Sequence, residues 1–195
     1  MELQIIHNYA RIDRAILLQK EMLDQGISWR VWPAIMNPTV SFVGVCQAHK
    51  QIVRWANQEG LKEVCIGEDD LHFFAPGAWD FFLQNKPEDF DLYLGGVFYG
   101  HLDEENVVKD WCGMTLYIVN ERFYDTFLGL NEWNNLDREL AFKGRYVVCN
   151  PFVVTQHGGY SDNKKYARES YDEYLQGRKL FGVPEIKIPN NMSGI

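Results

Sequence analysis

Apolar segments of two different periodicities alternate over the first 70 residues, and this alternation limits the possible folds more than any other feature. Segments with strand character are separated by segments with helical character, in the order 3–9, 13–26, 28–35, 44–60 and 63–67. Strand, helix, strand, helix, strand is typical of a doubly wound sheet with right-handed crossovers. We therefore expect an α/β domain with a mostly parallel central sheet flanked by helices.

The two helical segments are predicted from the spacing of their apolar residues and from the residues at their ends. The first segment places Ile16, Leu17, Met22 and Leu23 near one face. The second segment repeats apolar side chains every three or four positions, at Val45, Ala48, Ile52, Trp55 and Ala56. Asp13 is the predicted N-cap of the first helix, and Gly26 and Gly60 are the predicted stops.

Strands and helices continue to alternate further along the chain. The predicted helices span 77–85, 121–130 and 134–144, and the predicted strands span 90–96, 113–120 and 145–156, the last one broken by Pro151. We expect one domain over residues 1–163. The remainder, 164–195, is charged and rich in tyrosine, and we expect a tail that is helical over 165–176 and then irregular.

Composition excludes some classes of function. The formal net charge of −8 argues against nonspecific nucleic-acid binding, because a phosphate backbone requires a basic face. A local basic pocket for a phosphorylated small molecule remains compatible with that charge. Hydrophobic residues make up 46% of the chain, which predicts a substantial core.

The sequence also gives expectations about compartment. The four cysteines contain no C-x-x-C pair and lie mostly within apolar runs, so we expect reduced thiols in a cytoplasmic protein. The opening residues lack a basic start followed by a long apolar segment, which predicts no signal peptide. No apolar run approaches the ~20 residues that span a bilayer, so we expect no transmembrane segment.

Three consecutive carboxylates, Glu68, Asp69 and Asp70, directly follow the third predicted strand. In an open parallel sheet, ligands bind beyond the carboxyl ends of the strands, so the triplet is expected to project into a crevice. Adjacent carboxylates repel one another, and a divalent cation removes that repulsion. Hard oxygen ligands suit Mg²⁺ or Mn²⁺. The alternative is a solvated acidic turn, and the residues alone leave both interpretations open.

Several stretches of the sequence, in this order, are similar to segments of one enzyme family. They are "NYARIDR" at 8–14, "QGISWRVWPAI" at 25–35, "GVCQAHKQIVRW" at 44–55 and the Glu-Asp-Asp triplet, followed by "FDLYLGG" at 90–96, "GMTLYIVNERFYDTFL" at 113–128, "LDREL" at 136–140 and "VVCNPFVVTQHGGYSDN" at 147–163. Together they resemble the family 25 glycosyltransferases, which include the lipooligosaccharide galactosyltransferases. Ala48 stands where that family usually has serine, and His7-Asn8-Tyr9 stands where an Asn-Leu-Asp-type start is commoner.

The resemblance implies a GT-A-like fold and transfer of a sugar from a nucleotide diphosphate sugar, such as a UDP-sugar, to a hydroxyl of a glycan or glycolipid acceptor. It implies a role in surface glycan or lipooligosaccharide synthesis, in the cytoplasm or at the inner face of the membrane. Mn²⁺ or Mg²⁺ would stabilise the departing diphosphate. The expected metal ligands are Asp70, Asp69 and His157.

The resemblance also assigns residues to the substrates. The expected nucleotide and substrate contacts are Asn8, Arg11, Arg14, His49, Glu68, Asp69, Gln156, Ser161 and Asp162. An inverting transfer needs a base for the acceptor proton, and Asp137 is the first candidate with Glu139 the second. Four aromatic residues are candidates for stacking on an acceptor sugar: Tyr99, Trp111, Trp133 and Tyr160.

Each assignment has an alternative. The two arginines can simply lie at the start of the first helix, although a helix N-terminus disfavours cations. His49 can be a structural histidine, His157 a loop residue without a role, and Asp137 an N-cap. At the level of function, the alternatives are a non-catalytic nucleotide-sugar-binding relative, which Ala48 favours, and a nucleotidyltransferase, against which the absence of a Gly-rich phosphate loop argues.

Overall fold

The computed structural model describes residues 1–162, 165–168 and 170–184. Its central sheet has the strand order β2-β1-β3-β9-β5-β10-β7. In chain order these strands are β1 (Leu3–His7), β2 (Trp29–Pro33), β3 (Glu63–Glu68), β5 (Leu92–Leu94), β7 (Val107–Val108), β9 (Leu116–Asn120) and β10 (Tyr146–Val148). Strands β2, β1, β3, β5 and β10 share one direction, whereas β9 and β7 run the opposite way. The predicted α/β class with a mostly parallel central sheet is confirmed.

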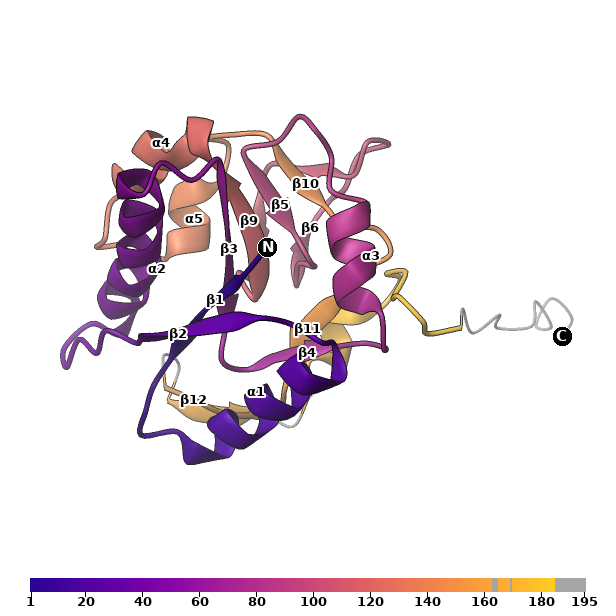
Figure 1. Cartoon of the computed structure of the whole chain (residues 1–195), viewed down its shortest axis with the longest axis horizontal. Coiled ribbons are helices and arrows are strands. Elements are labelled where there is room, and N and C mark those ends of the chain that lie inside the picture. Colours follow the sequence, from indigo (N-terminus) through magenta and orange to yellow (C-terminus); the bar gives the residue numbers. More distant parts are fainter. Residues whose placement is uncertain (163–164, 169, 185–195) are drawn as a thin grey trace, which may run out of the picture.

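Helices cover both faces of this sheet (Figure 1). They are α1 (Ile12–Asp24), α2 (Ser41–Gln58), α3 (Ala78–Gln84), α4 (Tyr124–Leu128, preceded by the 3₁₀ turn η1 at Glu121–Phe123) and α5 (Leu136–Leu140). Successive strand residues point to opposite faces. Val64 and Ile66 therefore join the core beneath α2, α4 and α5, while Cys65 joins the core beneath α1 and α3.

Helix α1 confirms the predicted helix but not its predicted cap or buried face. The helix begins at Ile12 after an Arg11 N-cap, and Asp13 lies in its first turn. Ile16 and Leu23 are each 65% exposed, whereas the buried positions are Leu18, Glu21 and Met22. Apolar side chains occur on two sides of this helix, and its partners on β4 (Leu71–Phe73) and on the central sheet determine which side is buried. Glu21 can be buried because its carboxylate accepts from His72 Nδ1, His157 Nε2 and the backbone N–H of Phe73.

The predicted stops of α1 and α2 are confirmed. Gly26 and Gly60 have φ of +65° and +67°, a left-handed conformation that L-residues with a side chain rarely adopt. Helix α2 begins at Ser41, three residues before the predicted start. Ala48 on α2 is buried, as the apolar spacing predicted.

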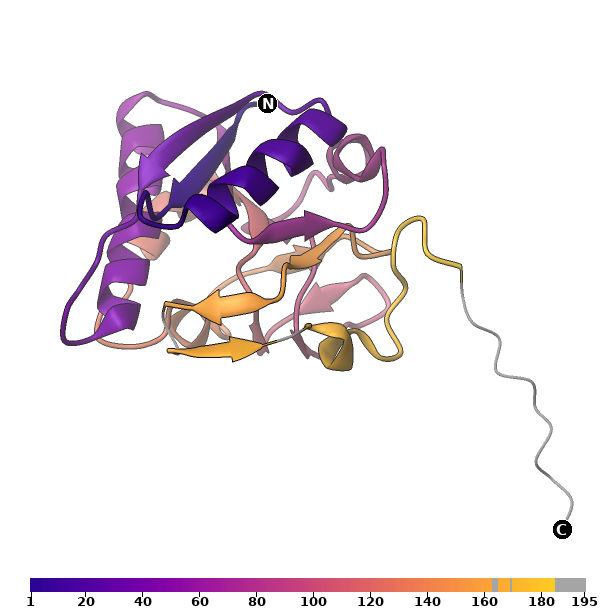
Figure 2. The same ribbon diagram turned by 90° about the horizontal axis from the view of Figure 1, so that it is seen from below.

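Among the described residues, the remaining strands form three small antiparallel pairs. They are β4 (Leu71–Phe73) with β11 (Val154–Gln156), β6 (Tyr99–Gly100) with β8 (Trp111–Cys112), and β12 (Gly159–Ser161) with β13 (Tyr166–Arg168). The last pair is a hairpin that Figure 2 shows from below as two adjacent orange arrows.

The predicted helix over 165–176 is wrong. Its first part is β13, whose backbone pairs with β12, and only Asp172–Leu175 forms a 3₁₀ turn, η2. The ring centroid of Phe98 lies 4.9 Å from that of Tyr171, on which it stacks, and 5.5 Å from that of Tyr174. Aromatic packing, not helical periodicity, therefore holds this segment. Of the tail predicted to be irregular, residues 185–195 lie outside the described residues.

None of the four cysteines forms a disulfide, and three of them are buried. Within the described part of the chain, no helix combines the length and the apolar character that crossing a membrane requires.

Candidate active site

A cavity of about 770 Å³ opens at the carboxyl edge of the sheet, a volume within the ~300–1,000 Å³ of small-molecule sites. The ends of β1 and β3 form its floor, and the loop 34–39 with the first half of α2 forms one wall. The start of α5 and the segments around β8, β12 and η2 complete it. Parallel strands β1, β2 and β3 all end at this edge, which is why residues distant in sequence meet here.

Most of the site residues predicted from the sequence line this single cavity. They are Asn8, His49, Glu68, Asp69, Asp70, Asp137, Gln156, Ser161 and Asp162. Four predicted residues do not line it: Arg11, Arg14, Glu139 and His157.

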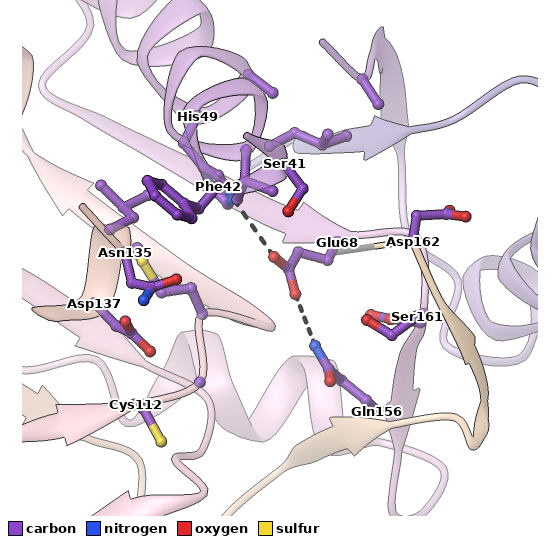
Figure 3. Close-up of a pocket in the computed structure, with 18 of the residues that line it drawn as sticks. Ser41, Phe42, His49, Glu68, Cys112, Asn135, Asp137, Gln156, Ser161 and Asp162 are labelled. Atoms are coloured by element: carbon purple, nitrogen blue, oxygen red, sulfur yellow. Dashed lines mark hydrogen bonds and ion pairs between the residues drawn. The ribbon is translucent and has the colours of Figure 1, made fainter. Parts of the chain in front are cut away.

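Glu68 projects from the end of β3 into the cavity and is held on both sides (Figure 3). Gln156 Nε2 donates to Glu68 Oε2 at 2.7 Å, and His49 Nε2 lies 3.5 Å from Glu68 Oε1. His49 is itself 1% exposed, and its Nδ1 lies 2.6 Å from the Tyr117 hydroxyl. His49 is thus a buried, hydrogen-bonded ring beside a carboxylate that faces the cavity, as the structural interpretation predicts. Its contact to a nucleotide stays a prediction.

Asp69 points toward β1 and α1, and both of its oxygens are occupied. Oδ1 accepts from Arg14 at 2.6 Å, and Oδ2 lies 2.7 Å from His7 Nδ1 and accepts from the backbone N–H of Asn8 at 3.2 Å. Each Asp69 oxygen thus has a donor within the protein, and the carboxylate joins β1, β3 and α1. The metal role of Asp69 stays a prediction.

Asp70 is buried but only partly satisfied. Its Oδ2 lies 3.0 Å from Arg14 Nη2, while no hydrogen-bond partner reaches Oδ1 within the described part of the chain. Burial, with the negative charge of Glu68, raises the pKa of Asp70 to about 8, and Arg14 offsets part of that rise. The burial of Asp70 next to Glu68 therefore raises the free energy of the folded state, and a bound cation would lower it.

Asp137 lies across the cavity from Glu68, on the first turn of α5 (Figure 3). Its Oδ1 accepts from the backbone N–H of Arg138 at 2.8 Å. Burial raises the pKa of Asp137, although the charge of Arg138 opposes the rise. Glu139, the second candidate base, instead accepts from Lys143 and Asn134 at 3.0 and 2.9 Å and does not line the cavity.

The two arginines predicted to pair with phosphate are paired within the protein. Arg11 bonds Asp13 at 2.7 and 2.9 Å and Asp162 at 3.1 Å. Arg14 bonds Asp69 and Asp70, and both guanidinium groups donate to the Tyr160 carbonyl at 2.9 and 3.1 Å. They join the start of α1 to the acidic triplet and to β12, so both guanidinium groups have partners within the protein. Their contacts to phosphate stay a prediction.

His157 does not line the cavity. Its backbone N–H donates to the Asp70 carbonyl at 2.7 Å, but its ring packs 4.5 Å from the ring of His72 and contacts Glu21. The side chain therefore does not complete a site with Asp70. Glu21, His72 and His157 form a separate cluster that offers one carboxylate oxygen and two ring nitrogens.

Of the four aromatic residues predicted to stack on an acceptor sugar, one lines the cavity and three do not. Trp111 is fully buried in the core, and Trp133 and Tyr160 are exposed outside the cavity. Tyr99 is 57% exposed and does line the cavity.

Several lining residues were not predicted from the sequence. They are the loop 34–39, Ser41 and Phe42 on α2, Asn135 and Arg138 beside Asp137, and Tyr171 and Tyr174 near η2. The loop could have been found, because it follows a strand parallel to β1 and so lies at the same sheet edge. The tyrosines gave no such signal, since they reach the cavity through a 3₁₀ turn that the periodicity did not predict.

The comparisons with known proteins bear on the fold alone. No protein-family profile matches the chain, and no curated protein matches it in sequence. Among solved structures, A197 from STIV is similar with a TM-score of 0.51 at 11% identity, over 87% of this chain and 93% of that chain.

Two further solved structures are more distant. HddC from Yersinia pseudotuberculosis complexed with GMP-PN has a TM-score of 0.48 at 13% identity, over 76% of this chain and 89% of that chain. The Drosophila β1,4-galactosyltransferase 7 mutant with manganese, UDP-Gal and xylobiose has a TM-score of 0.46 at 10% identity, over 95% and 77%. At these scores and identities the likeness carries no argument about activity.

Proposed function

We propose that this chain is a metal-dependent glycosyltransferase, which moves a sugar from a nucleotide diphosphate sugar to an acceptor hydroxyl. One observation carries the proposal. A buried Asp70 with an unpartnered oxygen lies beside Glu68, in a cavity that a third carboxylate, Asp137, faces from the opposite wall. The resemblance of the sequence to family 25 glycosyltransferases points to the same class of reaction.

Glu68 and Asp70 are the residues that would hold Mn²⁺ or Mg²⁺. Both offer the hard oxygen atoms that these ions prefer, and an ion there would satisfy Asp70 Oδ1 and relieve the repulsion between the two carboxylates. The ion would supply electrostatic stabilisation of charge on the leaving diphosphate. Gln156 and His49 would keep Glu68 oriented toward the cavity.

The nucleotide end of the donor is assigned to the β1 side of the cavity. Asn8, Ser161 and Asp162 line that side. The first turn of the 18-residue helix α2 also lines the cavity, contains no acidic residue and has no side-chain cap. The partial positive charge of such a helix start suits a diphosphate.

Asp137 is the proposed base for an inverting transfer. Its carboxylate takes the proton of the acceptor hydroxyl as the acceptor oxygen bonds to the anomeric carbon. The bond from that carbon to the phosphate oxygen breaks, and the nucleoside diphosphate leaves with the electron pair. A raised pKa suits this task, because a base with a pKa closer to the working pH accepts a proton more readily.

A thermal-shift screen of nucleoside diphosphates and nucleotide sugars, each with Mn²⁺ and with EDTA, tests the proposal. A ligand that binds only the native state raises the apparent melting temperature. We expect UDP or a UDP-sugar to raise it more with Mn²⁺ than with EDTA. The Asp70→Asn variant should lose the Mn²⁺-dependent part, whereas Asp80→Asn, the same change on the exposed surface of α3, should keep it. A screen in which no nucleotide raises the melting temperature under either condition contradicts the proposal.

The alternative is a protein that binds nucleotide sugars without catalysis. Ala48, which lines the cavity where the family usually has serine, favours it. This protein would give the same thermal shifts but no transfer to any acceptor, and the two readouts separate the two functions.

A further inference from the structure

We propose that Glu21, His72 and His157 form a second metal site, one that binds Zn²⁺ and joins α1 to the β4–β11 pair. The proposal requires no nucleotide and is independent of the function proposed above. The ligands come from three separate elements: Glu21 from α1, His72 from the middle of β4 and His157 from the residue after β11. The antiparallel register, in which His72 pairs with Thr155, brings the two imidazoles to the same end of this small sheet.

The geometry of the cluster is close to that of a bound ion. His72 Nδ1 lies 2.7 Å and His157 Nε2 lies 3.0 Å from the same atom, Glu21 Oε1. The three ligand atoms all lie within 4.8 Å of one another. Ligands about 2.0–2.1 Å from a tetrahedral zinc ion are roughly 3.4 Å apart, so the two separations from Glu21 Oε1 would widen by about half an ångström to admit the ion.

The carboxylate is also oriented in advance. The other oxygen, Glu21 Oε2, accepts from the backbone N–H of Phe73 at 3.1 Å, which fixes the plane of the group and directs Oε1 at the two rings. Such outer contacts of a metal ligand fix its orientation and add to the affinity. Glu21 is 8% exposed, an unusual degree of burial for a glutamate on the surface of a helix.

The donor set selects the kind of metal. Two imidazoles and one carboxylate suit Zn²⁺, whereas the all-oxygen pair Glu68 and Asp70 suits Mn²⁺ or Mg²⁺. The His72 side chain is 43% exposed, which gives an ion a path from solvent and leaves room for water as a fourth ligand. The backbone N–H of His157 donates to the carbonyl of Asp70, which connects the cluster to the edge of the cavity.

Calorimetric titration of ZnCl₂ into the full chain, stripped of metal with EDTA and dialysed, tests the site. We expect one equivalent to bind. His72→Gln and His157→Gln should each weaken binding at least about tenfold, since even outer-shell contacts of a metal ligand are worth about 10–100-fold in affinity. Glutamine retains a polar group next to Glu21, and far-UV circular dichroism of each variant checks that the fold is kept.

Three control variants separate this site from other zinc ligands. His101→Gln removes an exposed histidine elsewhere, Cys112→Ser removes the thiol that lines the cavity, and Asp70→Asn alters the proposed Mn²⁺ site. All three should bind zinc as the wild type does. Co²⁺ in place of Zn²⁺ should give visible absorption typical of a four-coordinate site in the wild type and not in His72→Gln. If the wild type and His72→Gln bind zinc equally, or if Asp70→Asn or Cys112→Ser alone abolishes binding, the cluster is a hydrogen-bonded triad and the proposal is wrong.

Discussion

Two groups of charged residues meet at the end of β3 and differ in how completely their charges are paired. In the paired group, His7, Arg14 and Asp69, both Asp69 oxygens accept from donors at 3.2 Å or less. In the open group, Glu68, Asp70 and Asp137, Asp70 Oδ1 has no partner within the described residues and the pKa of Asp137 is raised. Consecutive residues of one acidic triplet thus differ in their pairing: Asp69 joins β1, β3 and α1, and Asp70 belongs to the proposed metal site.

The difference follows from the free energy of burying charge. A buried carboxylate that keeps its hydrogen bonds loses little on folding, whereas an unsatisfied one carries its desolvation cost in the native state. Stabilising residues should therefore lower the free energy of unfolding when they are replaced, and ligand-binding residues should not. The predictions below test that distinction.

The largest expected effect is on catalysis. Asp137→Asn should lower the rate of sugar transfer by about 10²–10⁴-fold, the usual worth of general acid–base catalysis, and leave nucleotide affinity nearly unchanged. Steady-state kinetics with an identified acceptor and calorimetry with the nucleotide measure the two quantities. Glu139→Gln removes a carboxylate two residues away that faces Lys143 and Asn134, and it should keep full activity.

The outcome distinguishes three accounts. If transfer survives in Asp137→Asn, the base lies elsewhere or the reaction retains configuration. If nucleotide binding is lost together with transfer, Asp137 belongs to the binding residues. Loss of transfer in Glu139→Gln instead would assign the base to Glu139.

The next effect is on stability and concerns the paired group. Asp69→Ala leaves Arg14 and His7 without their shared partner, and removing one member of a buried ion pair costs about 3–5 kcal/mol. The midpoint of urea unfolding should fall accordingly. A change of less than about 1 kcal/mol would show that Asp69 is not the residue that stabilises this junction.

Asp70→Asn should leave the free energy of unfolding unchanged or raise it, and it should weaken nucleotide binding. A carboxyl whose pKa is raised in the folded state binds an extra proton there, so the wild type loses stability as the pH rises from 3.8 to about 8. The Asn variant lacks this loss and should unfold, free of metal, at the same or a higher urea concentration at pH 8. Its nucleotide affinity in Mn²⁺ should fall roughly 10–100-fold, the worth of a charged hydrogen bond or ligand contact of about 1.5–3 kcal/mol.

The smallest expected effect is on the pH dependence of the transfer rate, and it appears only at acid pH. The transfer rate should fall as Asp137 takes up its proton, and since burial raises its pKa, the acid limb should lie above the ordinary aspartate value of 3.8. Hydrogen bonds from Asn134 and Lys143 lower the pKa of Glu139, so a limb below the ordinary glutamate value of 4.5 would indicate that residue instead. The pH dependence of kcat/KM measures the limb.

The sequence predicted the parts of the molecule that local periodicity controls. The alternation up to Glu68, the stops at Gly26 and Gly60, and the position of the triplet at the sheet edge all follow from spacing and backbone preference. The buried face of α1 did not, because apolar side chains lie on both of its sides and Glu21 is buried by partners 51 and 136 residues away.

For the site, the sequence could predict which residues approach the sheet edge, but not how their side chains are paired. Parallel strands end together, so Asn8 and Glu68 could be placed there from topology, whereas His49, within α2, was assigned through the family resemblance. Which oxygens are already paired depends on side-chain contacts over long sequence separations, such as Arg14 with Asp69. For that reason the sequence assigned Arg14, Asp69 and His157 to ligands, whereas their side chains are engaged within the protein.

Calorimetric titration of UDP into the wild type and Asp70→Asn, each with Mn²⁺ and with EDTA, tests most directly whether the open group is a metal-dependent nucleotide site. We predict that Mn²⁺ strengthens UDP binding to the wild type and not to the variant, while both proteins keep the same far-UV circular dichroism. UDP binding that is identical in all four titrations, or no binding of any nucleoside diphosphate in any of them, would contradict that account.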